Sequence, residues 1–232
     1  MTRAVLAGTL TLLVSRAAIA EVDPAAGGVD VSSRFVAGVN IGGGRGDESM
    51  TTPQGGGRYQ NIITIGAVIG GEHRIFDRLW LGGFIGLSQW TDGTGVDAGY
   101  LYRRFDVGVA PRVELYRRPA RVMTTSFDLA LPFGLSQPFV WVPQRRAFSE
   151  DVENGWGWYA GGTGSMTMLF GKRRSRVPAP SFGFRVEIGY YHRPGHQRTT
   201  FTPTDATQPR VVEERDVFDD DLVFTAAAVV GF

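Results

Sequence analysis

The 232-residue chain contains no cysteine, which excludes a disulfide framework, a thiolate metal site and a lipid-modified N-terminal cysteine. It also has little excess of charge of either sign. Of its 24 Lys and Arg residues, Arg3 and Arg16 lie in the first twenty positions, which leaves 22 basic against 23 acidic residues in the rest of the chain. This balance argues against a nucleic-acid-binding protein, because such proteins usually carry a basic excess.

Long apolar runs are missing after residue 20. No stretch there approaches the roughly eighteen apolar residues that a membrane-spanning helix needs. An open sheet edge would leave backbone groups without hydrogen-bond partners in lipid. If this chain crosses a bilayer, it must therefore do so as a closed β-barrel.

The first twenty residues are typical of a cleavable export signal. Arg3 supplies a short basic head, residues 4–14 are apolar, and residues 18–20 (Ala-Ile-Ala) form a small-residue cleavage site. We therefore predict a signal peptide over residues 1–20, a short periplasmic segment over 21–33 and an outer-membrane β-barrel over 34–232.

Eight segments alternate apolar with polar or small residues, with the period of two that strands require. They cover about residues 34–41, 63–70, 79–90, 104–115, 127–136, 158–170, 182–190 and 222–232. The 32 glycines, spread through apolar segments, favour strands over helices. The number of segments is even, and their lengths are near the roughly nine to eleven residues of a tilted membrane strand. The pattern predicts an all-β protein, an eight-stranded antiparallel up-and-down transmembrane β-barrel.

The connections between these segments alternate in length, as this topology requires. Those at about 72–78, 117–121 and 172–180 are short, and those at about 43–58, 91–99, 138–155 and 193–221 are mostly longer. We expect short periplasmic turns and long external loops. The last loop is acidic, at Glu213, Glu214, Asp216, Asp219, Asp220 and Asp221. Its oxygen ligands suit Ca²⁺ or Mg²⁺, although a solvated acidic loop explains the same residues.

Aromatic residues fall near both ends of the predicted strands, as the two interfacial girdles of a membrane barrel require. The outer set is Trp90, Trp141, Trp156, Trp158, Tyr190 and Tyr191, and the inner set is Phe35, Trp80, Tyr116, Phe182 and Phe232. Two prolines fit this scheme poorly, because a barrel has no free edge where a missing N–H is harmless. We expect Pro111 and Pro132 each to mark a bulge or an early strand end, with the fourth strand ending near Ala110.

The inward faces of the predicted strands carry charges that balance. By parity, four arginines and four acids point inward: Arg34, Arg104, Arg112, Arg185, Asp106, Glu114, Asp128 and Glu187. The interior of an eight-stranded barrel is only wide enough for side chains to fill, and an isolated buried charge is costly. We expect these groups to pair and to hold the lumen shut; a narrow ion path is the alternative.

An enzymatic function is a further alternative. His192 and His196 lie near the outer end of the seventh predicted strand, and Ser149, Glu150 and Asp151 lie in a neighbouring predicted loop. However, His192 lacks the His-x-Ser spacing of lipid A deacylases, and the chain has no Gly-x-Ser-x-Gly elbow. We therefore assign no catalytic, cofactor-binding or metal-binding residue, and expect no enzymatic activity.

The export signal, the eight alternating segments and terminal Phe232 resemble the small outer-membrane β-barrels, the class that includes OmpX-like proteins and the membrane domain of OmpA. In that class, alternate apolar residues before a terminal aromatic are read by the outer-membrane assembly machinery. Phe224, Ala226, Ala228, Val230 and Phe232 match this pattern, with the two small alanines as a mild departure. The resemblance implies a monomer in the bacterial outer membrane, in contact with lipid and lipopolysaccharide, with a structural or surface-interaction role and no nucleic-acid partner.

Overall fold

The computed structural model describes residues 29–51, 62–92, 101–120, 122–141, 148–171, 180–203, 207 and 211–232. The strands are β1 (Ser33–Thr51), β2 (Ile62–Phe76), β3 (Leu79–Asp92), β4 (Leu101–Pro119), β5 (Met123–Ala130), β6 (Phe133–Trp141), β7 (Phe148–Asn154), β8 (Gly157–Phe170), β9 (Ser181–Pro203) and β10 (Val211–Gly231). Among the described residues, no helix is long and apolar enough to cross a membrane.

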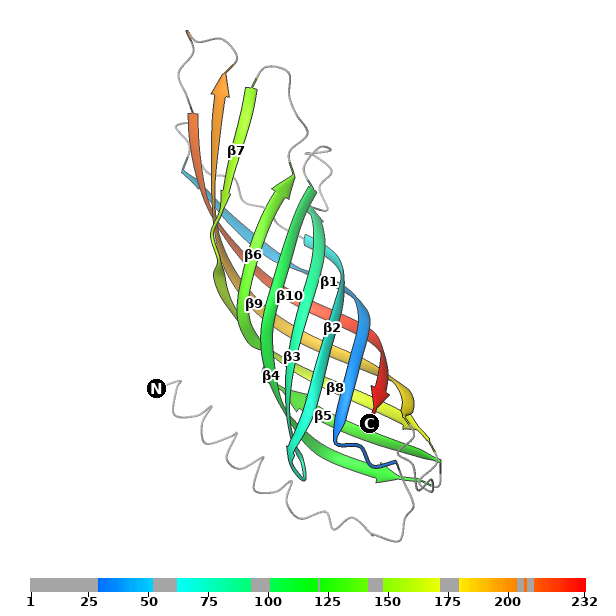
Figure 1. Ribbon diagram of the computed structural model, residues 1–232. Coiled ribbons are helices and arrows are strands. Elements are labelled where there is room, and N and C mark those ends of the chain that lie inside the picture. Colours follow the sequence, from blue (N-terminus) through cyan, green and yellow to red (C-terminus); the bar gives the residue numbers. More distant parts are fainter. Residues whose placement is uncertain are drawn as a thin grey trace, which may run out of the picture.

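The ten strands form one closed antiparallel barrel, shown in Figure 1. Two of its eight strands are interrupted, because β5 and β6 both pair with β4, and β7 and β8 both pair with β9. β10 pairs with β1 and closes the ring. The predicted all-β, eight-stranded antiparallel barrel is therefore confirmed.

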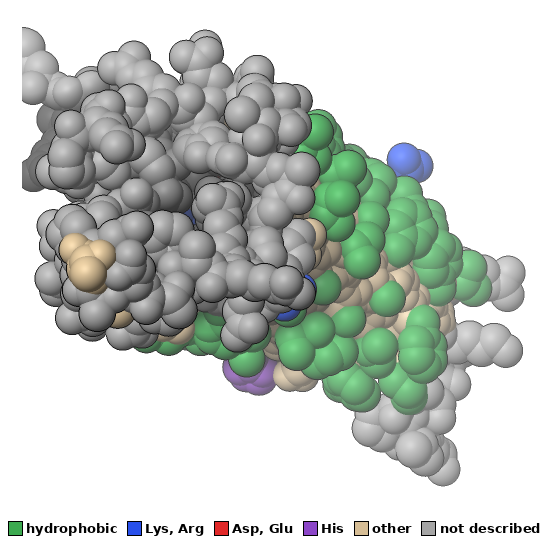
Figure 2. All heavy atoms as spheres, turned by 90° about the horizontal axis from the view of Figure 1, so that it is seen from above, with side chains coloured by type: hydrophobic (Ala, Val, Ile, Leu, Met, Phe, Trp, Pro, Cys, Tyr) green, Lys and Arg blue, Asp and Glu red, His purple; other side chains and the backbone are tan. Residues whose placement is uncertain are grey.

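The part of the outer barrel surface that is visible in Figure 2 is largely apolar. Large apolar side chains alternate with inward-facing residues along the strands, and many are half exposed or more, such as Val39 at 65% and Ile65 at 60%. Ile41, Ile69, Leu87, Leu135 and Phe224 are also at least half exposed, and Ile85, Val107, Phe127, Phe184 and Val186 are 37–48% exposed. An exposed apolar belt of this kind is a lipid-contact surface, because exposing so much apolar area to water would cost free energy.

Aromatic residues mark the two ends of this belt. Trp156, Trp158 and Tyr190 are exposed towards the outer end, and Phe35, Tyr116, Phe182 and Phe232 are exposed towards the inner end. The prediction is wrong for Trp80, which is fully buried in the lumen because it has the inward parity of its strand. Tyr191 also has inward parity and is only partly exposed. The side chains of Trp90 and Trp141 lie outside those that the structure describes.

Several strands continue beyond their predicted ends. β1 reaches Thr51 and pairs there with β10, and β9 and β10 pair from Val211↔Phe201 down to the inner end of the barrel. The predicted loop at 193–221 is therefore wrong, because residues 193–203 and 211–221 are strand; β7 likewise lies in the predicted loop at 138–155. These extensions lie past the apolar belt, so neither of their faces needs apolar residues. In Figure 1, β7 lies beside the extended part of β9, on the side away from β10.

The two prolines have different effects on the barrel. Pro132 lies in the break between β5 and β6, but the predicted end of the fourth strand near Ala110 is wrong, because β4 continues to Pro119. The carbonyl oxygen of Pro111 accepts a hydrogen bond of 3.0 Å from the N–H of Leu131, which lies in the same break. A strand residue directs its N–H and C=O to one neighbour. The nitrogen of Pro111 therefore also faces the break between β5 and β6, where a missing N–H costs few strand hydrogen bonds.

A charge placed in the middle of the belt should destabilise the barrel strongly. Ile85, at the centre of β3 and 44% exposed, should lose about 2–4 kcal/mol of folding free energy on substitution Ile85→Arg, because the guanidinium must enter hydrocarbon. Phe76→Arg, beside the turn that follows β2, should cost only about 0–1 kcal/mol. Urea unfolding in lipid vesicles measures both values, and equal costs would contradict the assignment of the belt.

Candidate functional site

The lumen gathers the charged side chains of the inward positions. Of the eight predicted charges, Arg34, Arg104, Asp106, Arg112, Glu114, Asp128 and Arg185 are each at most 6% exposed, and the side chain of Glu187 is 13% exposed. They come from β1, β4, β5 and β9, and alternation along each strand directs them inward. Their pairing forms two networks, one nearer each end of the barrel.

The inner ion network consists of Arg34, Glu72, Arg112, Glu114, Asp128, Arg185 and Glu187. At its centre Arg185 donates two hydrogen bonds to the Glu72 carboxylate, from Nη1 to Oε1 at 2.6 Å and from Nη2 to Oε2 at 2.7 Å. This bidentate geometry is the strongest form of such a pair. Nε of Arg112 lies 3.2 Å from Oε1 of Glu72, and its Nη2 donates to Glu187 at 2.8 Å.

Arg34 extends the inner ion network across the barrel. Its guanidinium lies 3.4 Å from Glu114 and 3.9 Å from Asp128, and 3.8 Å from the centre of the Trp80 ring. Stacking on an indole is a favourable position for a cation. Glu114 also pairs with Arg117 at 2.6 Å, so it has a cation on either side.

The outer ion network consists of Arg104, Asp106, Arg193 and Asp221. Asp221 is completely buried; one of its oxygens lies 2.8 Å from Arg193 and 3.4 Å from Arg104. Arg193 also lies 3.4 Å from Asp106, and its guanidinium is 4.3 Å from the centre of the Tyr191 ring. Two arginines thus surround one acid that has no access to solvent.

The sequence interpretation missed three members of these networks. Glu72 was placed in a short turn, and Arg193 and Asp221 in the last loop; all three placements are wrong, because the residues lie in β2, β9 and β10 with inward parity. Continuing the period of two beyond the apolar residues would have found them. From Gly70, two further residues along β2 reach Glu72, and from Val223, two residues back along β10 reach Asp221.

The inner mouth of the barrel is occupied by the segment that precedes β1, residues 29–32, which we call the mouth segment. Val29 and Val31 are buried in an apolar cluster with Trp80, Leu169 and Val229. The backbone of the segment is also bound: Thr124 donates to the carbonyl of Val29 at 2.9 Å. The N–H groups of Ser32 and Ser33 donate to the carbonyl of Phe232 at 2.8 and 3.2 Å.

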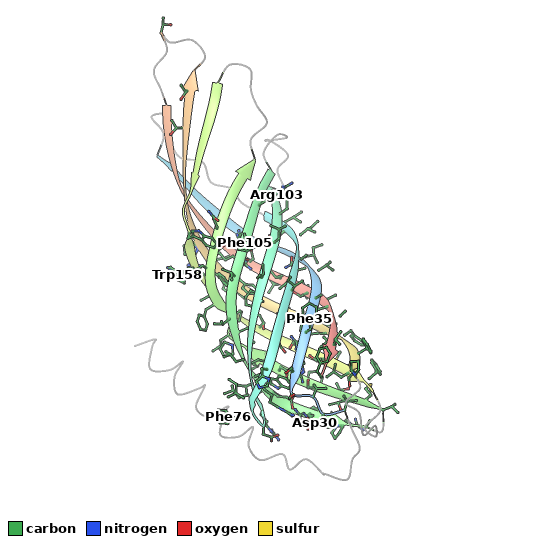
Figure 3. All side chains as sticks on the ribbon, in the orientation of Figure 1. Asp30, Phe35, Phe76, Arg103, Phe105 and Trp158 are labelled. Atoms are coloured by element: carbon green, nitrogen blue, oxygen red, sulfur yellow. The ribbon has the colours of Figure 1, made fainter. Side chains whose placement is uncertain are left out.

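Nearby glycines leave space for the mouth segment, and ion pairs hold its Asp30. A Cβ on Gly231 would lie 2.8 Å from Val31, which is too close, and one on Gly171 would make a tight contact of 3.3 Å with Val29. Glycine at these two positions therefore leaves room for the two valines. Asp30 pairs with Arg74 at 2.7 Å and with Arg117 at 3.6 Å. Figure 3 shows Asp30 at the end of the barrel opposite to Arg103. The segment thus contacts strands from all round the mouth.

The residues predicted as an assembly signal lie on the lipid-facing side of β10. Phe224 and Phe232 are 50% and 60% exposed, Ala226 and Ala228 are exposed, and Val230 is partly exposed. Their common face follows from even parity, since the odd positions between them are mostly buried. Recognition of this face by assembly machinery stays a prediction.

His192 and Ser149 of the enzymatic alternative lie far apart along the barrel, and the side chain of His196 lies outside those that the structure describes. Nδ1 of His192 lies 2.7 Å from Oδ1 of Asp220, and the imidazole ring lies 5.7 Å from the ring of Trp158, on the outer surface. Ser149 pairs with Thr202, ten residues further along β9 than His192, which is about 33 Å of strand. Among the described residues, no group of three His, Cys, Asp or Glu side chains is placed to hold a metal ion.

Comparisons with known proteins show a likeness in structure. No family model matches the chain, and no curated protein matches it in sequence. The outer membrane protein OprG from Pseudomonas aeruginosa matches with a TM-score of 0.51 at 10% identity, over 87% of this chain and 97% of that one. AlkL (TM-score 0.43, 12% identity, 91% and 96%) and Ail of Yersinia pestis, the attachment invasion locus protein (0.35, 10%, 88% and 100%), are also similar. At these identities the likeness concerns the fold.

The closed barrel and its exposed apolar belt define the class of the protein. It is a small integral β-barrel of the bacterial outer membrane, as the resemblance read from the sequence implied. The belt supplies the lipid contact, and closure of the sheet by β1 and β10 leaves no open edge in the membrane-spanning part.

Removing one partner of the central ion pair should destabilise the barrel more than removing both. Arg185→Met removes the bidentate partner of Glu72 and leaves the buried network with one cation fewer, although Arg112 still lies 3.2 Å from Glu72. We expect a cost of up to about 3–5 kcal/mol of folding free energy, the range for breaking a buried ion pair. Adding Glu72→Met should recover part of the loss. A double-mutant cycle measured by urea unfolding should give a coupling energy of up to about 3 kcal/mol. If the two single-variant effects simply add up to that of the double variant, the Arg185–Glu72 interaction does not contribute to stability.

The mouth segment should depend on its apolar contacts rather than on its ion pairs. Val31→Asp places a carboxylate in the apolar cluster and should cost about 3 kcal/mol. Asp30→Asn removes the ion pairs to Arg74 and Arg117 of an acid that is 66% exposed, and should cost less than about 1 kcal/mol. The temperature at which the folded band disappears from unboiled gels compares the two variants. A larger effect of Asp30→Asn would contradict this account.

Proposed function

We propose that the protein is a closed outer-membrane barrel with a structural or surface-interaction role, and that neither conduction nor catalysis is its function. The observation that supports this most is that ion pairs span the lumen. Arg34 and Asp128 belong to β1 and β5, and Arg104 and Asp221 to β4 and β10. In the order of the ring these are opposite strands, four places apart among eight.

A solute moving along the axis would have to separate such pairs. Breaking a buried ion pair costs about 3–5 kcal/mol, since each charge then lacks compensation. The two networks lie in series, and the mouth segment fills the inner opening below them. We therefore propose that the lumen is closed in the resting protein and that the networks serve to hold the strands together.

The strand extensions support the surface-interaction part of the proposal. β9 and β10 continue as a paired hairpin past the apolar belt, with β1 and β7 on either side. An ordered sheet of this size exceeds what a connection between two strands requires. We propose that it recognises a partner at the cell surface, that lipid and lipopolysaccharide surround the belt, and that the protein acts as a monomer without a cofactor. We further propose that the lipid-facing residues of β10 guide its assembly.

Conductance measurements test the closed lumen directly. Purified protein in planar bilayers should give no current steps above the background of the membrane. Arg112→Ala, which removes contacts to both Glu72 and Glu187, and Glu114→Ala, which removes the acid between Arg34 and Arg117, should permit leak currents if the ion pairs are what closes the lumen.

The matched control for these variants is Arg118→Ala, an exposed arginine of the same strand beyond the networks, which should stay silent. Stepwise conductance of the wild-type protein that changes with Arg112→Ala would contradict the proposal and favour a narrow pore.

A further inference from the structure

The lumen contains a chamber of about 100 Å³ between the two ion networks. It exists because β2 and β3 present glycines where other strands present side chains: Gly70, Gly82 and Gly86 border it and have inward parity. A glycine contributes only backbone to the lumen, so the arginines and acids of the opposite strands do not fill the space beside it.

The ion networks bound the chamber at both ends. Arg112, Arg185 and Glu187 of the inner network line it, and so do Asp106 and Arg193 of the outer network. These side chains are engaged in ion pairs across the lumen. An occupant that moves along the barrel axis must therefore pass one of these ion pairs.

The walls of the chamber are apolar between its polar ends. They are formed by Val36, Val68, Phe84, Ala110, Val223 and Ala227. Three oxygen atoms of lining residues are buried and have no hydrogen-bond partner among the described residues: Oδ1 of Asp106, Oγ1 of Thr163 and Oδ1 of Asn40. Asp106 and Thr163 are themselves 6% and 5% exposed. Two of these atoms can only accept a hydrogen bond, and a buried acceptor without a donor is unfavourable.

These features together select the occupant. Water can donate to the three oxygens, because a polar site of this size holds water, but it makes none of the contacts with the apolar walls that a carbon chain would make. A hydrocarbon would suit the walls but leave the three oxygens without donors. A molecule with a short carbon chain and a hydrogen-bond-donating head group satisfies both. Since a cavity of about 150 Å³ holds benzene, this smaller chamber takes about four non-hydrogen atoms.

We propose that the chamber is a binding site for a small amphiphile, a short alkyl chain that carries a hydroxyl or primary ammonium group. Its head group donates to the oxygens of Asp106, Thr163 or Asn40, and its carbon chain lies against Val68 and Val223. The site does not depend on the closed-barrel function proposed above, because it requires exchange of one small molecule and no current.

Methyl NMR of the full-length protein in lipid nanodiscs, with labelled valines, tests the site. Titration with propan-1-ol, and separately with propylammonium, should shift the methyl signals of Val68 and Val223 in a saturable manner. Val39, which faces lipid, should show no saturable change. If Val68 and Val223 do not shift, or shift only in proportion to Val39 without saturation, the proposal is overturned.

A variant that fills the chamber provides the second test. A Cβ on Gly86 would meet its nearest atom at 3.6 Å, an ordinary contact, so Gly86→Val should fold and abolish the saturable shift at Val223. Gly162→Val is the matched control, since a Cβ there meets nothing within 4 Å and the residue is exposed on the lipid side of β8; it should bind normally. Unchanged binding by a folded Gly86→Val would overturn the proposal.

Further variants separate the effect of hydrogen bonds to the head group from the effect of the chamber volume. Thr163→Val keeps the size of the side chain and should weaken propan-1-ol binding by about five- to tenfold if its hydroxyl bonds the head group. Tighter binding of propylammonium than of propan-1-ol, lost in Asp106→Asn, would assign the charged head group to the carboxylate. A conducting wild-type protein would contradict the closed barrel alone, whereas loss of the saturable shifts would contradict the chamber site alone.

Discussion

Backbone hydrogen bonding in a medium without water is the constraint on which this structure depends. Every N–H and C=O within the belt needs a partner in a neighbouring strand, so the sheet must close, and β10 pairs with β1 along the whole membrane-spanning part. The prolines obey the same constraint. Pro111 and Pro132 lie at one break in the ladder, which concentrates the missing donors in a single place instead of weakening two.

Closure of eight strands creates the second problem, a narrow interior into which half of the side chains point. The protein fills it with charges that are far apart in the chain, such as Arg104 and Asp221, separated by 117 residues. Several of these pairs, such as Arg104–Asp221 and Arg185–Glu72, join strands that are not neighbours in the ring, and so they link the strands across the lumen as well as around it. Glycines on β2 and β3 leave the remaining volume as the chamber. Because side chains alternate along each strand, the same strands place apolar residues against lipid and charged residues in the lumen.

This alternation explains what could be predicted from the sequence. Parity predicted which residues of each strand face inward, and all eight predicted lumen charges lie there. Strand ends could not be predicted, because past the belt water contacts both faces and apolar residues no longer mark either. Glu72, Arg193 and Asp221 face the lumen, but they were missed because outward neighbours such as His73, His192 and Asp220 are polar and do not mark the strand. The pairing of particular charges depends on the stagger of the strands, and a glycine-rich strand does not show in its sequence which glycines will border a cavity.

The mouth segment has a consequence for the order in which the molecule forms. Its binding partners come from β2, β5, β8 and β10, and the hydroxyl of Ser32 lies 3.4 Å from a carbonyl 200 residues away, that of the last residue. No local folding event can form such a contact, because its loop spans almost the entire chain. The segment can therefore complete its contacts only when the last strand is in place. Protection of residues 29–32 from protease would then report complete assembly, and an exposed N-terminal end would distinguish stalled intermediates from mature protein.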